Sequence, residues 1–128
     1  MTPRAIAIIV PGEPTPKQSF RIGYRGRHFQ PACVRAAQNA VAWCAREAMA
    51  GEPPIVGPVR VRVTFARKSR RRVDADNLFK LVADALQGIV FENDAQIEYL
   101  ELTKCQVERL DEAKTIIEVE SIADWSRP

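Results

Sequence analysis

The sequence predicts an α+β fold, with one mixed β-sheet of about four strands, two main helices packed on it, and the element order β-α-β-α-β-β. Three observations support this prediction. An isoleucine-rich run opens the chain, two long segments have helical periodicity, and three segments alternate apolar and polar residues. At 128 residues the chain is long enough for one hydrophobic core and too short for two ordinary domains, so we expect residues 1–128 to form a single domain.

The first expected element is a buried strand at Arg4–Val10, which Pro11 and Gly12 close. The segment Pro11–Pro31 holds four of the nine prolines and should be an extended loop. Two interpretations of its composition remain open: an arm that grips phosphates and stacks on bases, or a long loop that aromatic side chains pin to the core. The loop interleaves the cations Lys17, Arg21, Arg25 and Arg27 with Phe20, Tyr24 and Phe29.

A helix should follow over Ala32–Ala50, because this alanine-rich segment contains no Gly or Pro and ends at Gly51. Its apolar stripe is Val34, Ala37, Val41, Cys44 and Ala48. The next segment, Val59–Ala66, alternates strictly between apolar residues and Arg or Thr. It should be a half-buried strand with one cationic side.

The second helix should have Asp76 as its N-cap and run from Asn77 to about Ile89. A turn at Phe91–Gln96 leads to two period-two segments. These segments, Ile97–Val107 and Lys114–Ile122, are joined by the polar residues 108–113 and should form a hairpin. The second helix carries the apolar stripe Leu78, Leu81, Val82, Ala85, Leu86 and Ile89.

Composition favours a soluble cytoplasmic protein. No apolar run approaches the 18 to 20 or so residues that a membrane helix needs, so we expect no membrane partner. The cysteines Cys33, Cys44 and Cys105 are odd in number and widely spaced, which favours buried free thiols over a zinc site or disulfides. The single histidine, His28, has no second histidine to help it bind a metal.

The net charge of +3 conceals an asymmetry along the chain. Residues 1–72 contain 14 Lys/Arg and 3 Asp/Glu, a formal +11, whereas residues 73–128 contain 5 and 13, a formal −8. Such a division is typical of a basic face that meets a polyanion. The alternative is two solvated surfaces of opposite sign that partly neutralise each other.

The most informative stretch runs from Arg67 to Asp94. A cationic run (Arg67, Lys68, Arg70, Arg71 and Arg72) is followed at once by the carboxylates of Asp74 and Asp76. Hard divalent cations such as Mg²⁺ take oxygen ligands, and cations hold phosphates, so the pattern predicts metal-dependent phosphodiester chemistry. In an extended segment, two acids spaced two apart would point to the same side.

Other side chains in this stretch allow functional and structural interpretations. Lys80 lies four residues after Asp76 and could stabilise charge on the phosphate, or could join an i, i+4 ion-pair ladder worth about 0.3 to 0.5 kcal/mol per pair. Asn77 could hydrogen-bond a carboxylate or the phosphate. An EF-hand is excluded, because the loop would require glycine at Phe79 and glutamate at Ala85.

The motif RRRVDADNLFKLVADAL, followed by ENDAQI, resembles the signature of RusA-type Holliday junction resolvases. The early Pro-rich loop and the two closing strands also resemble that family, so the resemblance covers nearly the whole chain. One departure is Asn93, where the family often has a second aspartate before D-A-Q. That residue can still offer an oxygen, but with a lower expected metal affinity.

The resemblance implies a homodimeric, Mg²⁺-dependent endonuclease, for which Mn²⁺ can substitute, that nicks four-way DNA junctions symmetrically in recombination and repair. It carries metal binding onto Asp74, Asp76 and Asp94, and a catalytic or phosphate-binding role onto Lys80. It implies branched DNA as partner and no small-molecule cofactor, and it makes a prophage origin plausible. The alternatives are a non-catalytic basic DNA-binding module, or a nuclease that prefers flaps or forks.

One geometric difficulty accompanies this assignment. A helix from Asn77 to Ile89 is about 20 Å long. The residues from Val90 to Asp94 reach at most about 17 Å when fully extended. Within one subunit, Asp94 could therefore meet Asp76 only if the helix is shorter or the turn folds straight back. Alternatively, Asp94 is supplied across a dimer interface, which would create two composite sites related by a two-fold axis.

Overall fold

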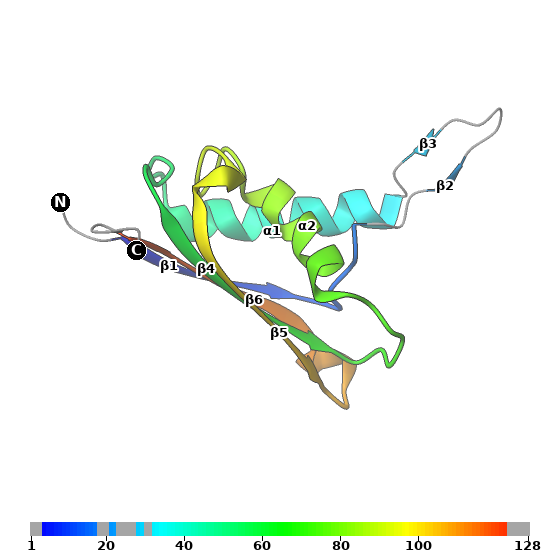
Figure 1. Cartoon of the computed structure of the whole chain (residues 1–128). Coiled ribbons are helices and arrows are strands. Elements are labelled where there is room, and N and C mark those ends of the chain that lie inside the picture. The colour runs from blue at the N-terminus through cyan, green and yellow to red at the C-terminus, as the bar shows by residue number, and fades with distance from the viewer. Residues whose placement is uncertain (1–3, 18–20, 23–27, 30–31, 123–128) are drawn as a thin grey trace.

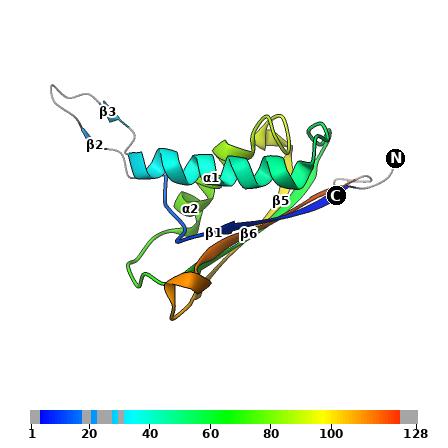
Figure 2. The same ribbon diagram turned by 180° about the vertical axis from the view of Figure 1, so that it is seen from behind.

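The computed structural model describes residues 4–17, 21–22, 28–29 and 32–122. Two helices cover one face of a four-stranded mixed sheet, as Figures 1 and 2 show from opposite sides. The predicted fold class and the order β-α-β-α-β-β of the main elements are confirmed. These elements are β1 (Ala5–Pro11), α1 (Ala32–Met49), β4 (Val59–Arg67), α2 (Ala75–Leu86), β5 (Ile97–Gln106) and β6 (Lys114–Ser121).

A short antiparallel ribbon, β2 (Arg21–Ile22) and β3 (His28–Phe29), interrupts the predicted extended loop. It lies beyond the N-terminal end of α1 (Figures 1 and 2). Two 3₁₀ turns complete the described elements: η2 (Asp94–Gln96) and η3 (Leu110–Glu112).

The strand order is β1-β6-β4-β5, with β4 parallel to β5 and β6 antiparallel to both of its neighbours. The predicted hairpin of the last two strands is therefore wrong, because β4 lies between β5 and β6. A short link suggested that these strands are neighbours. However, seven residues can span more than 20 Å, whereas strands two places apart are only about 10 Å apart.

The core lies between the sheet and the two helices. The inward residues of β4 are almost completely buried, with Val59 and Val61 at 0% exposure, which suits the centre of the sheet. On α1 the predicted stripe is correct at Val34 and Val41, and Ala37 and Cys44 pack partly against the core. Ala48 is exposed instead, since Ala45 and Met49 take the buried positions.

The helix α2 is shorter than predicted and ends at Leu86. Gly88, with a φ of 82°, redirects the chain in the left-handed conformation that glycine tolerates. The backbone then folds back, with the Gly88 N–H donating to the Phe91 carbonyl at 2.7 Å. Ile89 consequently packs against the core from outside the helix.

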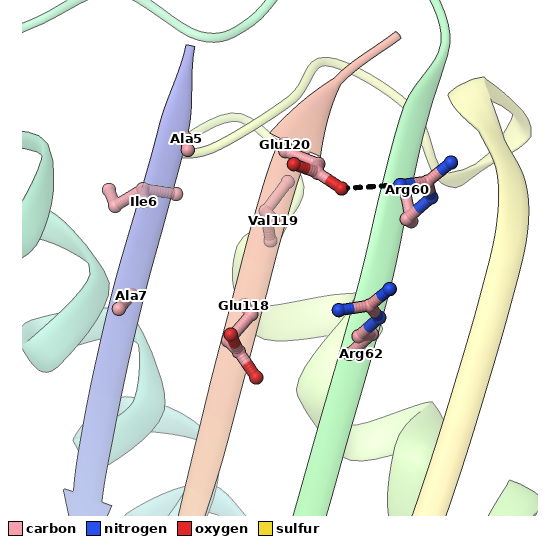
Figure 3. Close-up of a pocket in the computed structure, with 8 residues that line it drawn as sticks. All are labelled: Ala5, Ile6, Ala7, Arg60, Arg62, Glu118, Val119 and Glu120. Atoms are coloured by element: carbon pink, nitrogen blue, oxygen red, sulfur yellow. Dashed lines mark hydrogen bonds and ion pairs between the residues drawn. The ribbon is translucent and has the colours of Figure 1, made fainter.

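On the other face of the sheet lies no helix of the described residues, and ion pairs cross this face. Arg60 contacts Glu120 at 2.7 Å (Figure 3), and Arg62 lies 3.8 Å from Glu101. Each pair joins a cation from the first half of the chain to an acid from the second. Within the sheet, these two ion pairs neutralise part of the charge asymmetry. A hollow of about 220 Å³ on this face lies between β1, β6 and β4 (Figure 3).

No helix in the described part of the chain is long and apolar enough to cross a bilayer.

Candidate active site

Asp74 and Asp76 lie at the N-terminal end of α2. Asp74, and not Asp76 as predicted, is the N-cap. Its backbone is extended at φ −77° and ψ 141°, and its carbonyl accepts from the Asn77 and Leu78 N–H groups at 3.1 and 3.2 Å. Its carboxylate makes no capping hydrogen bond. An N-cap side chain usually satisfies one of the free helical N–H groups, so this exposed carboxylate remains available for a ligand.

Asp76 lies in the first turn of the helix, so the expectation that both acids occupy an extended segment is wrong. On a helix, side chains two positions apart differ in direction by about 200°. The same-side arrangement expected along a strand therefore does not apply to these two acids. The two acids nevertheless lie within one helical turn of each other, and both side chains are exposed.

A cleft of about 610 Å³ opens beside Asp74, between the Pro-rich loop and the basic loop (residues 67–73). Two acidic residues, Glu13 and Asp74, and three arginines therefore line the same space, which suits a phosphate next to a metal ion. The lining residues are Glu13, Pro14, Pro16, Arg67, Ser69, Arg71, Arg72, Val73, Asp74 and Asn77.

The carboxylate of Glu13 holds the basic loop in place. It accepts hydrogen bonds from the backbone N–H groups of Lys68 at 2.8 Å and Ser69 at 3.0 Å. The sequence interpretation missed this residue, although it is the only acid before Glu47. By anchoring two successive amides, Glu13 positions a loop in which like charges would otherwise repel one another.

The cations predicted to bind DNA have different surroundings. Lys68, Arg70, Arg71 and Arg72 are exposed. Arg67 is partly buried, and its Nε has no hydrogen-bond partner among the residues that the structure describes. Lys17 instead contacts Asp84 of α2 at 2.7 Å, and its backbone N–H donates to the Asn77 carbonyl at 3.1 Å. These contacts tie the Pro-rich loop to α2. Arg25 and Arg27 lie outside the described residues, as does the side chain of Arg21.

Lys80 is exposed on α2, one turn after Asp76. Among the described residues, Lys80 forms no ion pair with Asp76, and Asp84 pairs with Lys17 instead. The i, i+4 ladder is therefore not formed, and the ammonium group of Lys80 remains available to a ligand.

Asp94 lies at the opposite end of α2 from the other two acids. Its backbone N–H donates to the side chain of Gln87, the C-cap of α2, at 3.3 Å. The 12 residues of α2 span about 18 Å. Among the described residues, no three His, Cys, Asp or Glu side chains are close enough to hold a metal. One copy of the chain therefore does not unite Asp94 with Asp74 and Asp76.

The turn that carries Asp94 is organised by Gln96. Its Oε1 accepts from the backbone N–H groups of Glu92 at 2.9 Å and Asn93 at 3.1 Å. Its Nε2 donates to the carbonyls of Ile55 at 2.9 Å and Gly57 at 2.8 Å. The glutamine of the D-A-Q sequence thus fixes the acidic turn against the segment before β4.

Asn93 caps the same turn, since its Oδ1 accepts from the Ala95 N–H at 2.8 Å. This hydrogen bond occupies one lone pair of the oxygen that we expected to face a metal or a metal ligand. The residue is exposed, and its carbonyl oxygen retains a second lone pair.

Replacing Gln96 with Ala should lower the free energy of unfolding by about 1 to 3 kcal/mol, because two backbone carbonyls lose their side-chain donor. Urea denaturation followed by circular dichroism measures the change. Glu92→Ala, an exposed change in the same turn, should stay within about 0.5 kcal/mol of the unmodified protein. Equal stability of the two variants would show that the Gln96 contacts contribute little.

The chemistry of the acids fits a hard divalent cation. Mg²⁺ is commonly held by one or two protein carboxylates, with water and substrate phosphate as the remaining ligands. Asp74 and Asp76 supply two exposed carboxylates within one helical turn, and Asp74 lines the cleft together with arginines that can hold the phosphate.

A family model described as endodeoxyribonuclease RusA matches residues 11–120, which include the cleft, α2 and the acidic turn. The chain belongs to the RusA family. No curated protein gave a significant match. RusA membership makes the protein an endodeoxyribonuclease, from a family that binds branched DNA, resolves Holliday junctions and generally depends on divalent metals.

Proposed function

We propose that this RusA protein is a Mg²⁺-dependent homodimer that resolves four-way DNA junctions by paired symmetric nicks in recombination and repair. The observation that supports this most is the uncapped, exposed carboxylate of Asp74 beside Asp76, in a cleft bordered by Arg67, Arg71 and Arg72. A plain helix cap would direct its carboxylate to the helix N–H groups.

The residues have distinct roles in this proposal. Asp74 and Asp76, together with Asp94, hold the metal ion, which when bound supplies Lewis-acid polarisation and an activated water. The arginines of the cleft bind the phosphate on either side of the scissile bond. The ammonium group of Lys80 stabilises charge on the phosphate, and Asn77 orients a carboxylate or the phosphate by hydrogen bonding.

Asp94 completes the site from a second copy of the chain. The length of α2 favours this arrangement, because Asp94 is held at the end of the helix opposite to Asp74 and Asp76. Two composite sites related by a two-fold axis would match the approximate two-fold symmetry of a four-way junction, so that one dimer could nick two opposing strands.

The purified protein should cut a labelled synthetic four-way junction in Mg²⁺ or Mn²⁺, and faster than flaps, forks or linear duplex. Gel analysis of the products over time measures both rate and substrate preference. Binding without cutting in either metal would instead favour a non-catalytic DNA-binding module. Faster cutting of flaps or forks would retain the nuclease and exclude the four-way junction as its preferred substrate.

A further inference from the structure

Lys104 is a residue of β5 whose side chain reaches the N-terminal end of α2. It is in register with the buried Phe65 of β4, so its side chain lies on the face of the sheet that the helices cover. Its Nζ donates to the Val73 carbonyl at 2.7 Å, one residue before the N-cap Asp74. The sequence interpretation assigned no role to this lysine.

Two costs accompany this hydrogen bond. The N-terminal end of a helix carries a partial positive charge, which disfavours a cation there. Holding a long lysine side chain in one conformation also lowers its entropy. What the bond provides is a fixed position for one particular peptide unit, the one that joins Val73 to Asp74.

The peptide units on both sides of Asp74 are held in this way. Lys104 binds the carbonyl of the preceding unit. The carbonyl of Asp74 itself accepts from the N–H groups of Asn77 and Leu78 at 3.1 and 3.2 Å. Because peptide units are planar, holding both of them fixes the direction in which the Asp74 side chain leaves the backbone. That direction matters, since the carboxylate makes no capping hydrogen bond that would hold it.

The same lysine completes the anchoring of the basic loop. Glu13 holds two successive amides at the start of the loop. Gln106, the next helix-facing residue of β5, donates from Nε2 to the Lys68 carbonyl at 2.7 Å. Lys104 holds the last residue of the loop. The backbone that carries the cations is therefore fixed at both ends, relative to the carboxylate that follows it.

We propose that Lys104 is a positioning residue for Asp74, which acts through the Val73 carbonyl and sets the affinity of the site for its divalent metal. This inference rests on the proposed function, in which Asp74 binds the metal. Groups that orient a metal ligand without touching the metal commonly change metal affinity or activity by about 10- to 100-fold.

Lys104→Met should weaken the binding of Mn²⁺ to the DNA-free protein by about tenfold. Methionine keeps most of the length of the side chain but cannot donate to the carbonyl. Electron paramagnetic resonance of free Mn²⁺ measures the affinity, and Asp74→Asn identifies the binding that depends on Asp74. Lys104→Arg should bind Mn²⁺ as the unmodified protein does, because a guanidinium group also donates hydrogen bonds.

The sign of the change separates positioning from charge. Loss of a nearby cation would by itself strengthen Mn²⁺ binding, because like charges repel. The matched control is Lys114→Met, which removes the same charge from an exposed residue of β6. Lys114 is in register with Ala66, the residue after Phe65, and so lies at the same end of the sheet on the opposite face. This control should bind Mn²⁺ normally. Unchanged or stronger Mn²⁺ binding by Lys104→Met would overturn the proposal.

Junction cleavage and junction binding provide a second test. For Lys104→Met, the Mg²⁺ concentration that gives half of the maximal cleavage rate should rise by about tenfold. The salt dependence of junction binding, measured without divalent metal, should not change. A lysine that bound a phosphate directly would lower the slope of log affinity against log salt by about one when it is removed. Such a decrease would overturn the positioning role.

These measurements separate the role of Lys104 from the proposed function. If the protein cuts junctions and Lys104→Met binds Mn²⁺ as tightly as the unmodified protein, the function is retained and this inference is overturned. If the protein never cuts, but Mn²⁺ binding that depends on Asp74 weakens in Lys104→Met, the positioning role is confirmed and the proposed function is contradicted. Mn²⁺ binding that does not depend on Asp74 would overturn both.

Discussion

Asp76→Asn should abolish cleavage of a four-way junction and leave binding of that junction intact, and Asp74→Asn should behave in the same way. An amide lacks the charge that a carboxylate offers to a hard cation. We expect the cleavage rate to fall by about three orders of magnitude or more, equivalent to about 4 kcal/mol of transition-state stabilisation. Junction affinity should stay equal or rise, because the variant removes a negative charge from a surface that meets phosphates.

Single-turnover cleavage in Mg²⁺ measures the cleavage rate. Electrophoretic mobility shifts in Ca²⁺ measure junction affinity, at fixed salt because affinity for DNA depends steeply on salt. The matched control is Asp111→Asn, an exposed aspartate in η3 whose ion pair is with Arg109. The Asp111→Asn variant should cut the junction at the same rate as the unmodified protein. Retained cleavage by Asp76→Asn would remove this residue from the site, whereas joint loss of binding and cleavage would indicate a structural role.

A mixture of two inactive variants, Asp76→Asn and Asp94→Asn, should recover activity. If each site combines Asp76 of one copy with Asp94 of the other, a mixed dimer carries both changes in one site and leaves the second site intact. Random exchange makes about half of the dimers mixed, so about one quarter of the sites should work. Because a mixed dimer has a single working site, nicked junctions should accumulate before resolved duplexes.

The control mixture is Asp74→Asn with Asp76→Asn, which should remain inactive. Both changes affect the same half of the site, so every mixed dimer has one change in each of its two sites. Failure of the Asp76 and Asp94 mixture to recover, despite verified subunit exchange, would contradict a composite site. Asp94 would then have to reach the other acids within one chain.

The fold was largely predictable because its elements are encoded locally. The alternation of Val59, Val61 and Val63 produces the buried face of β4, and the stop at Gly51 ends α1 within one residue of the prediction. The pairing of the last two strands was not predictable from local pattern. Insertion of β4 between β5 and β6 buries its valines beneath the helices with a neighbouring strand on each side, which is a property of the whole core.

The candidate site was predictable in its composition and only partly in its geometry. The basic run before Asp74 indicated phosphodiester chemistry, and the cleft beside Asp74 contains three of those arginines. The role of Glu13 required the structure, because its partners, Lys68 and Ser69, lie more than 50 residues further along the chain. The contacts of Gln96 with Ile55 and Gly57 are long-range for the same reason.

The sequence alone determined which chemistry this protein carries, since cations beside carboxylates are a property of residue type and spacing. Tertiary structure alone decided where those groups lie. It made Asp74 the N-cap with a carboxylate that does not cap, and it held Asp94 one helix length away. The physical reason is that α2 is a rigid rod about 18 Å long. Because Asp94 is held at one end of this helix and Asp74 caps the other, these two residues cannot meet within one copy.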